Sequence, residues 1–328
     1  MTALDQPAAQ LLRWAETRLN AKIRLTPLPV DGGHRRYFRL EGQSLLALQG
    51  PDQAENLAWL RIGRHLWFKG LPLPRIQDYD IENGFFLLDD LGDLHLADST
   101  EPGRYYPLAV ELLARLHRQG LAGFSPDWGH QTRAYAASMI ATQEIGYFLD
   151  SVWVAYLKQP AWPRGAKTEA LALARQAAPR PGERVLMHRD FQGRNLMIQN
   201  GRLFCLDWQG ARPGAAAYDL ASLLNETPYV PLTDRFKEEL IEMYLKARGG
   251  GAWRRSFRGE LAVLSPIRLM QALAAYAKLT LAGKSKFAAF LPPAAALLAR
   301  YVSQPALAGF PILRETALEA ARRLETKS

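Results

Sequence analysis

The first 90 residues combine two stretches of helical periodicity with short apolar runs separated by turn residues. Apolar positions recur at helical spacing over residues 7–20 and 53–69, which predicts two amphipathic helices. Pro72 and Pro74 are expected to end the second helix because proline lacks the amide hydrogen that a helix needs. Strands are predicted at residues 36–40, 44–49 and 85–88.

After residue 93 long amphipathic helices dominate, and one β-rich island interrupts them over residues 185–207. The predicted fold class is therefore α+β with two lobes: a small β-containing N-lobe, residues 1–90, and a larger, mainly helical C-lobe, residues 91–328. A cleft between two lobes is a usual place for a ligand. The predicted C-lobe helices cover residues 103–119, 131–158, 166–178, 233–247, 258–282 and 292–302.

The composition, 48% hydrophobic and 22% charged over 328 residues, excludes disordered, collagen-like and low-complexity architectures. Cys205 is the only cysteine, so no intrachain disulfide can form and a reducing compartment is favoured. The N-terminus lacks the basic start and apolar core of a signal peptide, and the apolar stretch 287–299 is too short to span a bilayer. We expect a soluble, cytoplasmic protein without a membrane partner; the oligomeric state is open, with a monomer favoured.

The net charge of +9 comes from 41 basic and 32 acidic residues. Such an excess fits a solvated basic surface, a site for an anionic small molecule or a nucleic-acid interface. No run of five basic residues occurs, and basic and aromatic residues do not interleave. We therefore expect a small-molecule substrate and no nucleic-acid partner.

The most informative stretch starts at a His-Arg-Asp tripeptide whose last residue is Asp190. Asn195 follows five positions later, and Asp207 lies twelve positions beyond Asn195. Two apolar runs, 196–198 and 203–206, lie between them and are joined by an Asn-Gly dipeptide that predicts a tight hairpin turn. A hairpin that brings three such side chains together favours a phosphotransfer site over chance.

These residue types meet the needs of phosphate transfer from ATP. Mg²⁺ prefers oxygen ligands, and the Asp207 carboxylate and the side-chain carbonyl of Asn195 supply them while leaving room for phosphate oxygens. Asp190 can accept a proton from the acceptor hydroxyl and orient it. ATP and Mg²⁺ are accordingly the predicted cofactors, with Asp190 as the catalytic residue.

The segment resembles the aminoglycoside phosphotransferase and choline kinase branch of the protein-kinase-like fold. Residues 218–224 are similar to the helix that follows the metal-binding aspartate in that family, 112–117 to a C-lobe helix, and 86–92 to the hinge between the lobes. The resemblance implies that Asp219 caps its helix and braces the catalytic loop. We expect His188 to position this loop as a structural residue and not to act as the base, because Asp190 is better placed for that role.

The same resemblance implies that backbone groups of the hinge bind adenine, the residues concerned being Asp89, Asp90 and Leu91. Kinases of this fold generally hold the donor phosphates with a lysine on the third strand. The matching run, residues 44–49, contains no lysine, and the role of Glu55 on the following helix is open.

Another cation must therefore hold the phosphates, and a basic cluster that ends at Arg39 follows a Gly-Gly turn. Glycine lets backbone amides approach a phosphate, and guanidinium groups suit phosphate oxygens. We expect this loop to cover the phosphates, with a plain hairpin turn and solvated arginines as the alternative. The predicted nucleotide-binding residues of the loop are Gly32, Gly33, His34, Arg35 and Arg36.

A narrower resemblance, over residues 32–39, 143–150 and 270–301, points to the bacterial N-acetylmuramate/N-acetylglucosamine anomeric kinases. Those enzymes phosphorylate the C1 hydroxyl of a cell-wall amino sugar in peptidoglycan recycling, so the resemblance implies an N-acetylated amino sugar as acceptor. It makes Glu144 a candidate for binding sugar hydroxyls, with a solvated helix residue as an equal alternative.

Two arginines are candidates for binding an anionic group of the acceptor, such as a lactyl carboxylate, because arginine binds carboxylates through paired hydrogen bonds. Arg194 has the stronger case because it lies in the catalytic loop. For Arg268 a structural role is the favoured alternative. With Asp190 and Glu144 they form the predicted acceptor-binding set.

Two other functions remain open. An aminoglycoside or aminoalcohol kinase needs clustered carboxylates for a cationic acceptor, and Glu238, Glu239 and Glu242 lie on a polar helix face that is expected to be solvated. A catalytically silent, kinase-like nucleotide-binding protein fits the missing lysine. The intact set of catalytic and metal-binding side chains argues against it.

Overall fold

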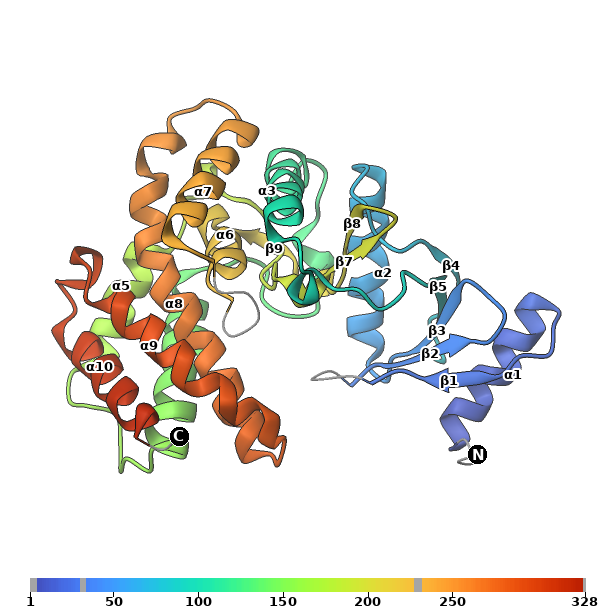
Figure 1. The fold of residues 1–328 in the computed structure, drawn as a ribbon, viewed down its shortest axis with the longest axis horizontal. Helices are drawn as coiled ribbons and strands as arrows, with labels where there is room; N and C mark the ends of the chain where they lie inside the picture. The colour runs from blue at the N-terminus through green and yellow to red at the C-terminus, as the bar shows by residue number, and fades with distance from the viewer. Residues whose placement is uncertain (1–4, 30–33, 227–231, 327–328) are drawn as a thin grey trace.

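The computed structural model describes residues 5–29, 34–226 and 232–326. One antiparallel sheet and helix α1 form one end of the molecule, and the helices of the second lobe form the other (Figure 1). Helix α2 lies between them. The predicted α+β, two-lobed fold is confirmed.

The sheet of the N-lobe has five strands in the order β1-β2-β3-β5-β4. The two strands that the sequence pattern missed, β1 and β4, give weak signals because the first has three residues and the second carries two aspartates. The strands are β1 (Leu25–Pro27), β2 (Arg36–Leu40), β3 (Leu45–Gln49), β4 (Ile76–Asp80) and β5 (Phe85–Asp89).

Successive residues of β2 face opposite sides of the sheet, as the pleat requires. Phe38 packs with Leu11 and Ala15 of α1 (Gln6–Leu19) in a small core that belongs to the N-lobe. Tyr37 faces the other way and packs against the main core, which continues through α2 into the C-lobe. One face of the sheet therefore closes the N-lobe, and the other builds the joint between the lobes.

Helix α2 (Gln53–Phe68) ends at a glycine turn. Gly70 has a φ of 68°, and the amide of Leu71 donates to the carbonyl oxygen of Leu66 at 3.1 Å. The prediction that Pro72 and Pro74 end this helix is wrong, because the glycine turn ends it first.

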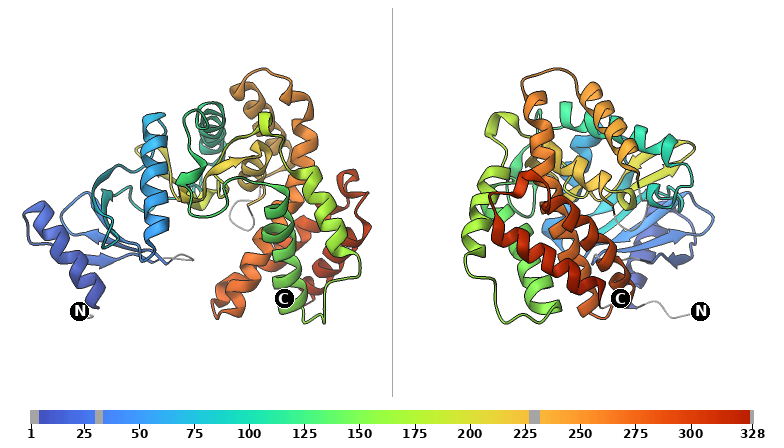
Figure 2. Two further views of the ribbon diagram at one scale, coloured as in Figure 1. Left: turned by 180° about the vertical axis from the view of Figure 1, so that it is seen from behind. Right: turned by 60° about the vertical axis from the view of Figure 1, so that its left-hand side comes forward.

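The C-lobe is mainly helical. Its long helices are α3 (Pro102–Gln119), α5 (Ala166–Ala177), α6 (Ala216–Leu224), α7 (Asp234–Arg248), α8 (Trp253–Leu281), α9 (Leu291–Val302) and α10 (Pro311–Glu325). Its shorter helices are η1 (Leu96–Asp98), η2 (Pro126–Trp128), α4 (Ala137–Met139), η5 (Pro181–Glu183), η6 (Gly193–Asn195), η7 (Trp208–Gly210), η8 (Ser285–Phe290) and η9 (Pro305–Leu307). Helix α9 packs between α8 and α10 at the end of the lobe remote from the sheet (Figure 2).

The helix expected over residues 131–158 differs from its prediction. It begins only at Ala137 and continues as two π-helical segments, η3 (Ile140–Gly146) and η4 (Leu149–Tyr156). Such segments widen the helix locally and are frequent at functional sites. Within the described ranges, no helix is long and apolar enough to cross a membrane.

Four short strands carry the polar segment that the sequence singled out: β6 (Val185–Met187), β7 (Leu196–Gln199), β8 (Arg202–Cys205) and β9 (Arg212–Gly214). Strands β7 and β8 form the predicted antiparallel hairpin, with Asn200 and Gly201 at its turn in the left-handed region. The amide of Cys205 donates to the carbonyl oxygen of Pro72 at 2.9 Å, so the hairpin is attached directly to the segment after α2.

Candidate active site

Asp219, which is fully buried, holds the backbone of the predicted catalytic loop, residues 188–195. Its carboxylate accepts hydrogen bonds from the amides of His188 (2.7 Å) and Arg189 (2.8 Å), and it lies 3.0 Å from Nε2 of His117. These bonds stabilise the left-handed backbone of Arg189, whose φ is 80°. Asp219 does not cap its helix: the N-cap of α6 is Ala215, and Asp219 lies in the first turn of the helix.

His188 lies beneath the loop, with 1% of its surface exposed. Its Nε2 is 2.9 Å from the carbonyl oxygen of Leu206 and 3.2 Å from Sγ of Cys205. The ring thus connects the start of the loop to the end of β8. Cys205 is buried beside it.

The three predicted catalytic and metal-binding side chains lie at one end of this hairpin. The side-chain amide of Asn195 donates to the backbone carbonyl of Asp190 at 2.9 Å, and its Oδ1 accepts no hydrogen bond from the part of the chain that the structure describes. The amide of Leu206 donates to the carbonyl oxygen of Asn195 at 2.8 Å, so the residue that follows, Asp207, is held beside the loop.

Asp207 is exposed to solvent within the joint, yet surrounding protein atoms and the negative charge of Asp190 raise the pKa of its carboxyl group. The Asp207 carboxylate, which the charge of Asp190 repels, and the nearby Asn195 side-chain oxygen fit a divalent cation, because the cation removes this repulsion. Asn195 and Asp207 are the residues that would hold such a cation.

A second polar group borders the loop from the C-lobe helices. Nη2 of the buried Arg268 is 3.8 Å from Oδ1 of Asp190, and its Nε donates to Oγ of Ser222 at 3.0 Å. Glu144 on η3 is fully buried and accepts a hydrogen bond from the Tyr218 hydroxyl at 2.8 Å. The solvated alternative for Glu144 is therefore wrong.

Burial raises the pKa of Glu144 to about 7, although the positive charges of Arg189 and Arg268 oppose this shift. Its Oε1 has no hydrogen-bond partner among the described residues. A buried carboxyl oxygen without a partner is available to a polar group that enters the site.

Of the two arginines considered for the acceptor, the structure favours Arg268 over Arg194, the reverse of the sequence-based expectation. Nη1 of Arg194 forms an ion pair with Asp98 of η1 at 2.7 Å, whereas Arg268 is the arginine beside Asp190. Position within the catalytic loop was the argument for Arg194, and packing from a distant helix outweighs it.

The arginines of the N-lobe go to three different places. Arg35 faces α2, and its Nη2 lies 3.5 Å from Oε1 of Glu55. Arg36 is on the opposite face of the sheet and pairs with Asp5 at the start of α1, at 2.7 Å. The assignment of Arg36 to the nucleotide is wrong, because the pleat turns it away from the joint.

Arg39 pairs with Asp90 at 2.5 Å and with Asp93 at 3.0 Å, so its guanidinium braces the hinge and does not cover phosphates as expected. His34 is exposed. The predicted residues Gly32 and Gly33 lie outside the described residues.

The three predicted hinge residues differ in how many backbone hydrogen-bonding groups remain available to a nucleotide base such as adenine. The amide of Asp89 donates to the carbonyl oxygen of Arg75, and the amide of Asp90 donates to that of Ser44, both at 3.1 Å. The backbone of Leu91 makes no hydrogen bond with the described residues. Of the three predicted residues, Leu91 therefore has the most available backbone.

Comparison with known proteins adds a family to this geometry. Residues 24–257 match the family model described as the phosphotransferase enzyme family, APH. The chain belongs to this family. The matched range contains β1 through the start of α8, and with them both lobes of the site.

Two curated relatives of this phosphotransferase family member carry the same name. The chain is 31% identical over 218 residues to the N-acetylmuramate/N-acetylglucosamine kinase of Pseudomonas aeruginosa, covering 62% of this chain and 60% of the relative. It is 27% identical over 263 residues to the N-acetylmuramate/N-acetylglucosamine kinase of Neisseria meningitidis serogroup B, covering 75% of each. The chain thus matches less than two thirds of the length of the Pseudomonas aeruginosa kinase.

Among solved structures, the choline kinase LicA from Streptococcus pneumoniae has a TM-score of 0.61 at 15% identity, over 90% of this chain and 99% of that chain. LicA is also known in complex with AMP. At this identity the likeness shows a shared protein-kinase-like fold and carries nothing about the acceptor.

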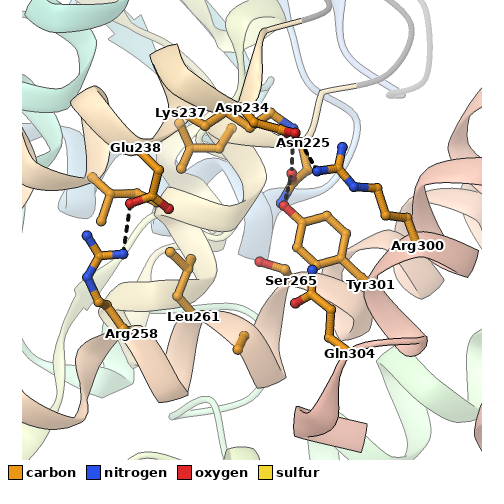
Figure 3. A pocket seen from close by; sticks show the side chains of 13 residues that line it. Asn225, Asp234, Lys237, Glu238, Arg258, Leu261, Ser265, Arg300, Tyr301 and Gln304 are labelled. Atoms are coloured by element: carbon orange, nitrogen blue, oxygen red, sulfur yellow. Dashed lines mark hydrogen bonds and ion pairs between the residues drawn. The ribbon is translucent and has the colours of Figure 1, made fainter.

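A cavity of about 270 Å³ lies elsewhere in this phosphotransferase family member, between α7, α8 and α9 (Figure 3). Its charged side chains already partner one another: Arg300 pairs with Asp234 at 2.6 Å, and Arg258 pairs with Glu238 at 2.9 Å. None of the predicted site residues lines it. The cavity is therefore not the active site.

Sequence reasoning missed Gln209, which links the two lobes. Its Nε2 donates to Oδ1 of Asp207 at 2.7 Å and to Oε1 of Glu55 at 3.3 Å. Trp208 beside it stacks on Trp59 of α2, with ring centroids 4.9 Å apart. The only sequence signal was the pair's position directly after Asp207, the predicted metal ligand.

Proposed function

We propose that this family member is an ATP- and Mg²⁺-dependent kinase that phosphorylates the C1 hydroxyl of an N-acetylated amino sugar, N-acetylmuramate or N-acetylglucosamine, in cell-wall recycling. The observation that carries phosphate transfer is the grouping of Asp190, Asn195 and Asp207 at the end of one braced hairpin. The names of the two curated relatives support the amino sugar. The AMP complex of a protein with this fold supports an adenine nucleotide.

The two lobes have different binding roles. In this proposal the N-lobe, residues 1–90, covers the nucleotide, and the C-lobe, residues 91–328, holds the catalytic loop, the metal ligands and the acceptor. The open backbone of Leu91 supports adenine binding at the hinge.

Asp190 carries the proton transfer. Its carboxylate accepts the proton of the acceptor hydroxyl as that oxygen attacks the terminal phosphate of the donor. Arg268, 3.8 Å away, limits where this carboxylate can turn. When bound by Asn195 and Asp207, Mg²⁺ supplies neutralisation of the charge on the donor phosphates.

The charges around the acceptor side favour an anion. Arg189 and Arg268 both lie near Glu144, and guanidinium groups bind carboxylates through paired hydrogen bonds, which supports a carboxylate-bearing sugar such as N-acetylmuramate. A cationic aminoglycoside or aminoalcohol would need a cluster of carboxylates that are not already paired. The carboxylates considered for it on α7 are neutralised by arginines, since Glu238 and Glu242 both pair with Arg258.

The test is a coupled assay of nucleoside-diphosphate release over N-acetylated amino sugars, aminoglycosides and aminoalcohols. We expect turnover with the amino sugars. Asp190→Asn should lower kcat by about a thousandfold or more because the group that accepts the proton is lost, with ATP affinity kept. Asp78→Asn on β4, which changes an exposed carboxylate of the N-lobe, is the matched control.

Full activity of Asp190→Asn would refute the assignment of the catalytic residue. Turnover with aminoglycosides alone would support the competing acceptor class. Stabilisation of the folded chain by Mg·ATP without turnover on any acceptor would support a nucleotide-binding protein that does not catalyse.

A further inference from the structure

Arg35 is a buried arginine with donors to spare. It lies directly before β2, and 6% of its side chain is exposed. Its Nη2 donates to the backbone carbonyl of Glu55 at 3.3 Å, and the guanidinium carbon lies 5.5 Å from the ring centroid of Trp59. Its Nε and Nη1 have no hydrogen-bond partner among the described residues.

Buried donors without partners are rare in folded proteins, because each one loses its hydrogen bonds to water. A buried guanidinium is more demanding still, since it carries five N–H groups and a full charge. The contacts of Arg35 with Glu55 and Trp59, and its interaction with the buried Tyr37, leave Nε and Nη1 without a hydrogen-bond partner among the described residues. These two groups are available to an acceptor that enters the site.

The side chains around Arg35 connect it to the predicted metal site. Glu55 accepts a second hydrogen bond from Gln209, at 3.3 Å, and Gln209 also donates to Asp207 at 2.7 Å. The guanidinium is therefore two side chains away from the carboxylate assigned to the metal. A ligand that bridges Arg35 and a cation at Asp207 must carry several negatively charged oxygens.

The neighbouring cations are committed elsewhere. Arg39 pairs with the hinge carboxylates of Asp90 and Asp93, and Arg36 pairs with Asp5 on the far face of the sheet. Strand β3 contains no lysine. Of Arg35, Arg36 and Arg39, Arg35 is therefore the one without a paired carboxylate on the hinge or the far face of the sheet, and its Nε and Nη1 have no hydrogen-bond partner among the described residues.

We propose that Arg35 binds the phosphate groups of the nucleoside triphosphate donor, with Glu55 and Gln209 holding its guanidinium in line with Asp207. This inference rests on the proposed function, because it assigns a residue to the donor of that reaction. It places the phosphate-binding cation at the entrance to β2 and not on β3. Guanidinium groups suit this task since they bind phosphate oxygens through paired hydrogen bonds.

The test is the affinity of the full chain for ATP and for adenosine with Mg²⁺ present, measured by calorimetry. Arg35→Met should raise the Kd for ATP about ten- to a hundredfold, the usual loss for a hydrogen-bonded charge, and leave adenosine binding unchanged. The Kd of Arg35→Lys for ATP should lie between those of the wild type and Arg35→Met, because lysine keeps the charge without the paired hydrogen bonds. Glu55→Gln should weaken ATP binding by a smaller factor.

Arg24→Met is the matched control, because Arg24 also pairs with a glutamate of the N-lobe, Glu41 at 3.4 Å, but on the exposed surface. It should bind ATP as the wild type does. Equal ATP affinity in wild type, Arg35→Lys and Glu55→Gln would overturn the inference even if Arg35→Met failed to fold. An equal loss for ATP and adenosine would also overturn it, since that result indicates a structural role.

The outcomes separate this inference from the proposed function. If the wild type phosphorylates an amino sugar and the Arg35 variants bind ATP normally, only the role of Arg35 is lost. If the wild type binds ATP through Arg35 but transfers phosphate to no sugar, only the proposed reaction is lost.

Discussion

The β7–β8 hairpin and strand β2 both lie near the joint between the lobes and have polar side chains in or beside them, but they place these side chains by different means. Asp190, Asn195 and Asp207 belong to one short segment whose own strands and turn bring them together. The arginines that accompany β2 are closer still in sequence, yet they contact different parts of the molecule. Arg35 contacts α2, while Arg39 contacts the hinge.

The pleat separates Arg36 from Arg35, and distance along the strand separates Arg35 from Arg39. Successive residues of a strand point to opposite faces, so adjacent basic residues cannot serve one ligand unless the chain leaves the strand geometry. A hairpin has the opposite effect, since its turn returns the chain to the same place. Clustered charges in a sequence therefore predict a site more safely around a turn than along a strand.

The largest effect is expected at Asp219, a residue outside the β7–β8 hairpin that holds the loop before it. Asp219→Ala leaves the buried amides of His188 and Arg189 without an acceptor, so we expect a loss of about 3–5 kcal/mol of stability together with most activity. Urea denaturation monitored by fluorescence measures the change.

Asp127→Ala is the control for this variant, since Asp127 is exposed and should cost about 0.5 kcal/mol or less. A stable, active Asp219→Ala protein would mean that the hairpin keeps its geometry alone. The contrast with β2 would then be even greater.

A second prediction concerns the buried carboxyl group on the acceptor side. Because the folded-state pKa of Glu144 is raised to about 7 from 4.5, its full contribution to stability is present below pH 4.5 and is lost as the pH rises to 7. The loss amounts to about 3 kcal/mol. Glu144→Gln cannot ionise, so its advantage over the wild type should be near zero at pH 4 and greatest at pH 8.

Thermal denaturation at pH 4, 6 and 8 tests this, with Glu111→Gln on the exposed surface of α3 as control. A pH-independent difference between Glu144→Gln and the wild type would show that Glu144 does not hold its proton in the folded state.

The smallest effect on stability is expected where α2 contacts Trp208, directly after the segment that carries Asp207. A Cβ on Gly63 of α2 would come within 2.7 Å of Nε1 of Trp208, the residue after Asp207. Gly63→Ala should therefore displace the indole, lower the stability by about 1–3 kcal/mol and raise the KM for ATP. Denaturant titration and steady-state kinetics measure the two changes.

Gly259→Ala provides the comparison, since a Cβ there meets nothing within 4 Å inside helix α8. It should stabilise the protein by about 0.5–1 kcal/mol, the usual gain for alanine over glycine in a helix. If both variants behaved alike, the contact between α2 and Trp208 would not constrain the joint.

Periodicity, turn residues and spacing predicted the two-lobed fold and the β7–β8 hairpin, and the structure brings Asp190, Asn195 and Asp207 close together as expected; the roles of these three residues stay predictions. These features are local: each depends on residues that are close in sequence and on side-chain types with defined chemistry. The same local signals predicted β2 and β3 but underestimated the disrupted helix after residue 131, because π-helical turns leave no distinct pattern.

Long-range packing settled the rest. The role of each arginine, the choice of Arg268 over Arg194 beside Asp190, and the link from Glu55 through Gln209 all depend on contacts between residues far apart in the chain. A charged side chain can reach several partners, and its partner is set by which elements bury it and on which face. That information exists only once α2, β2 and α8 are packed around the joint.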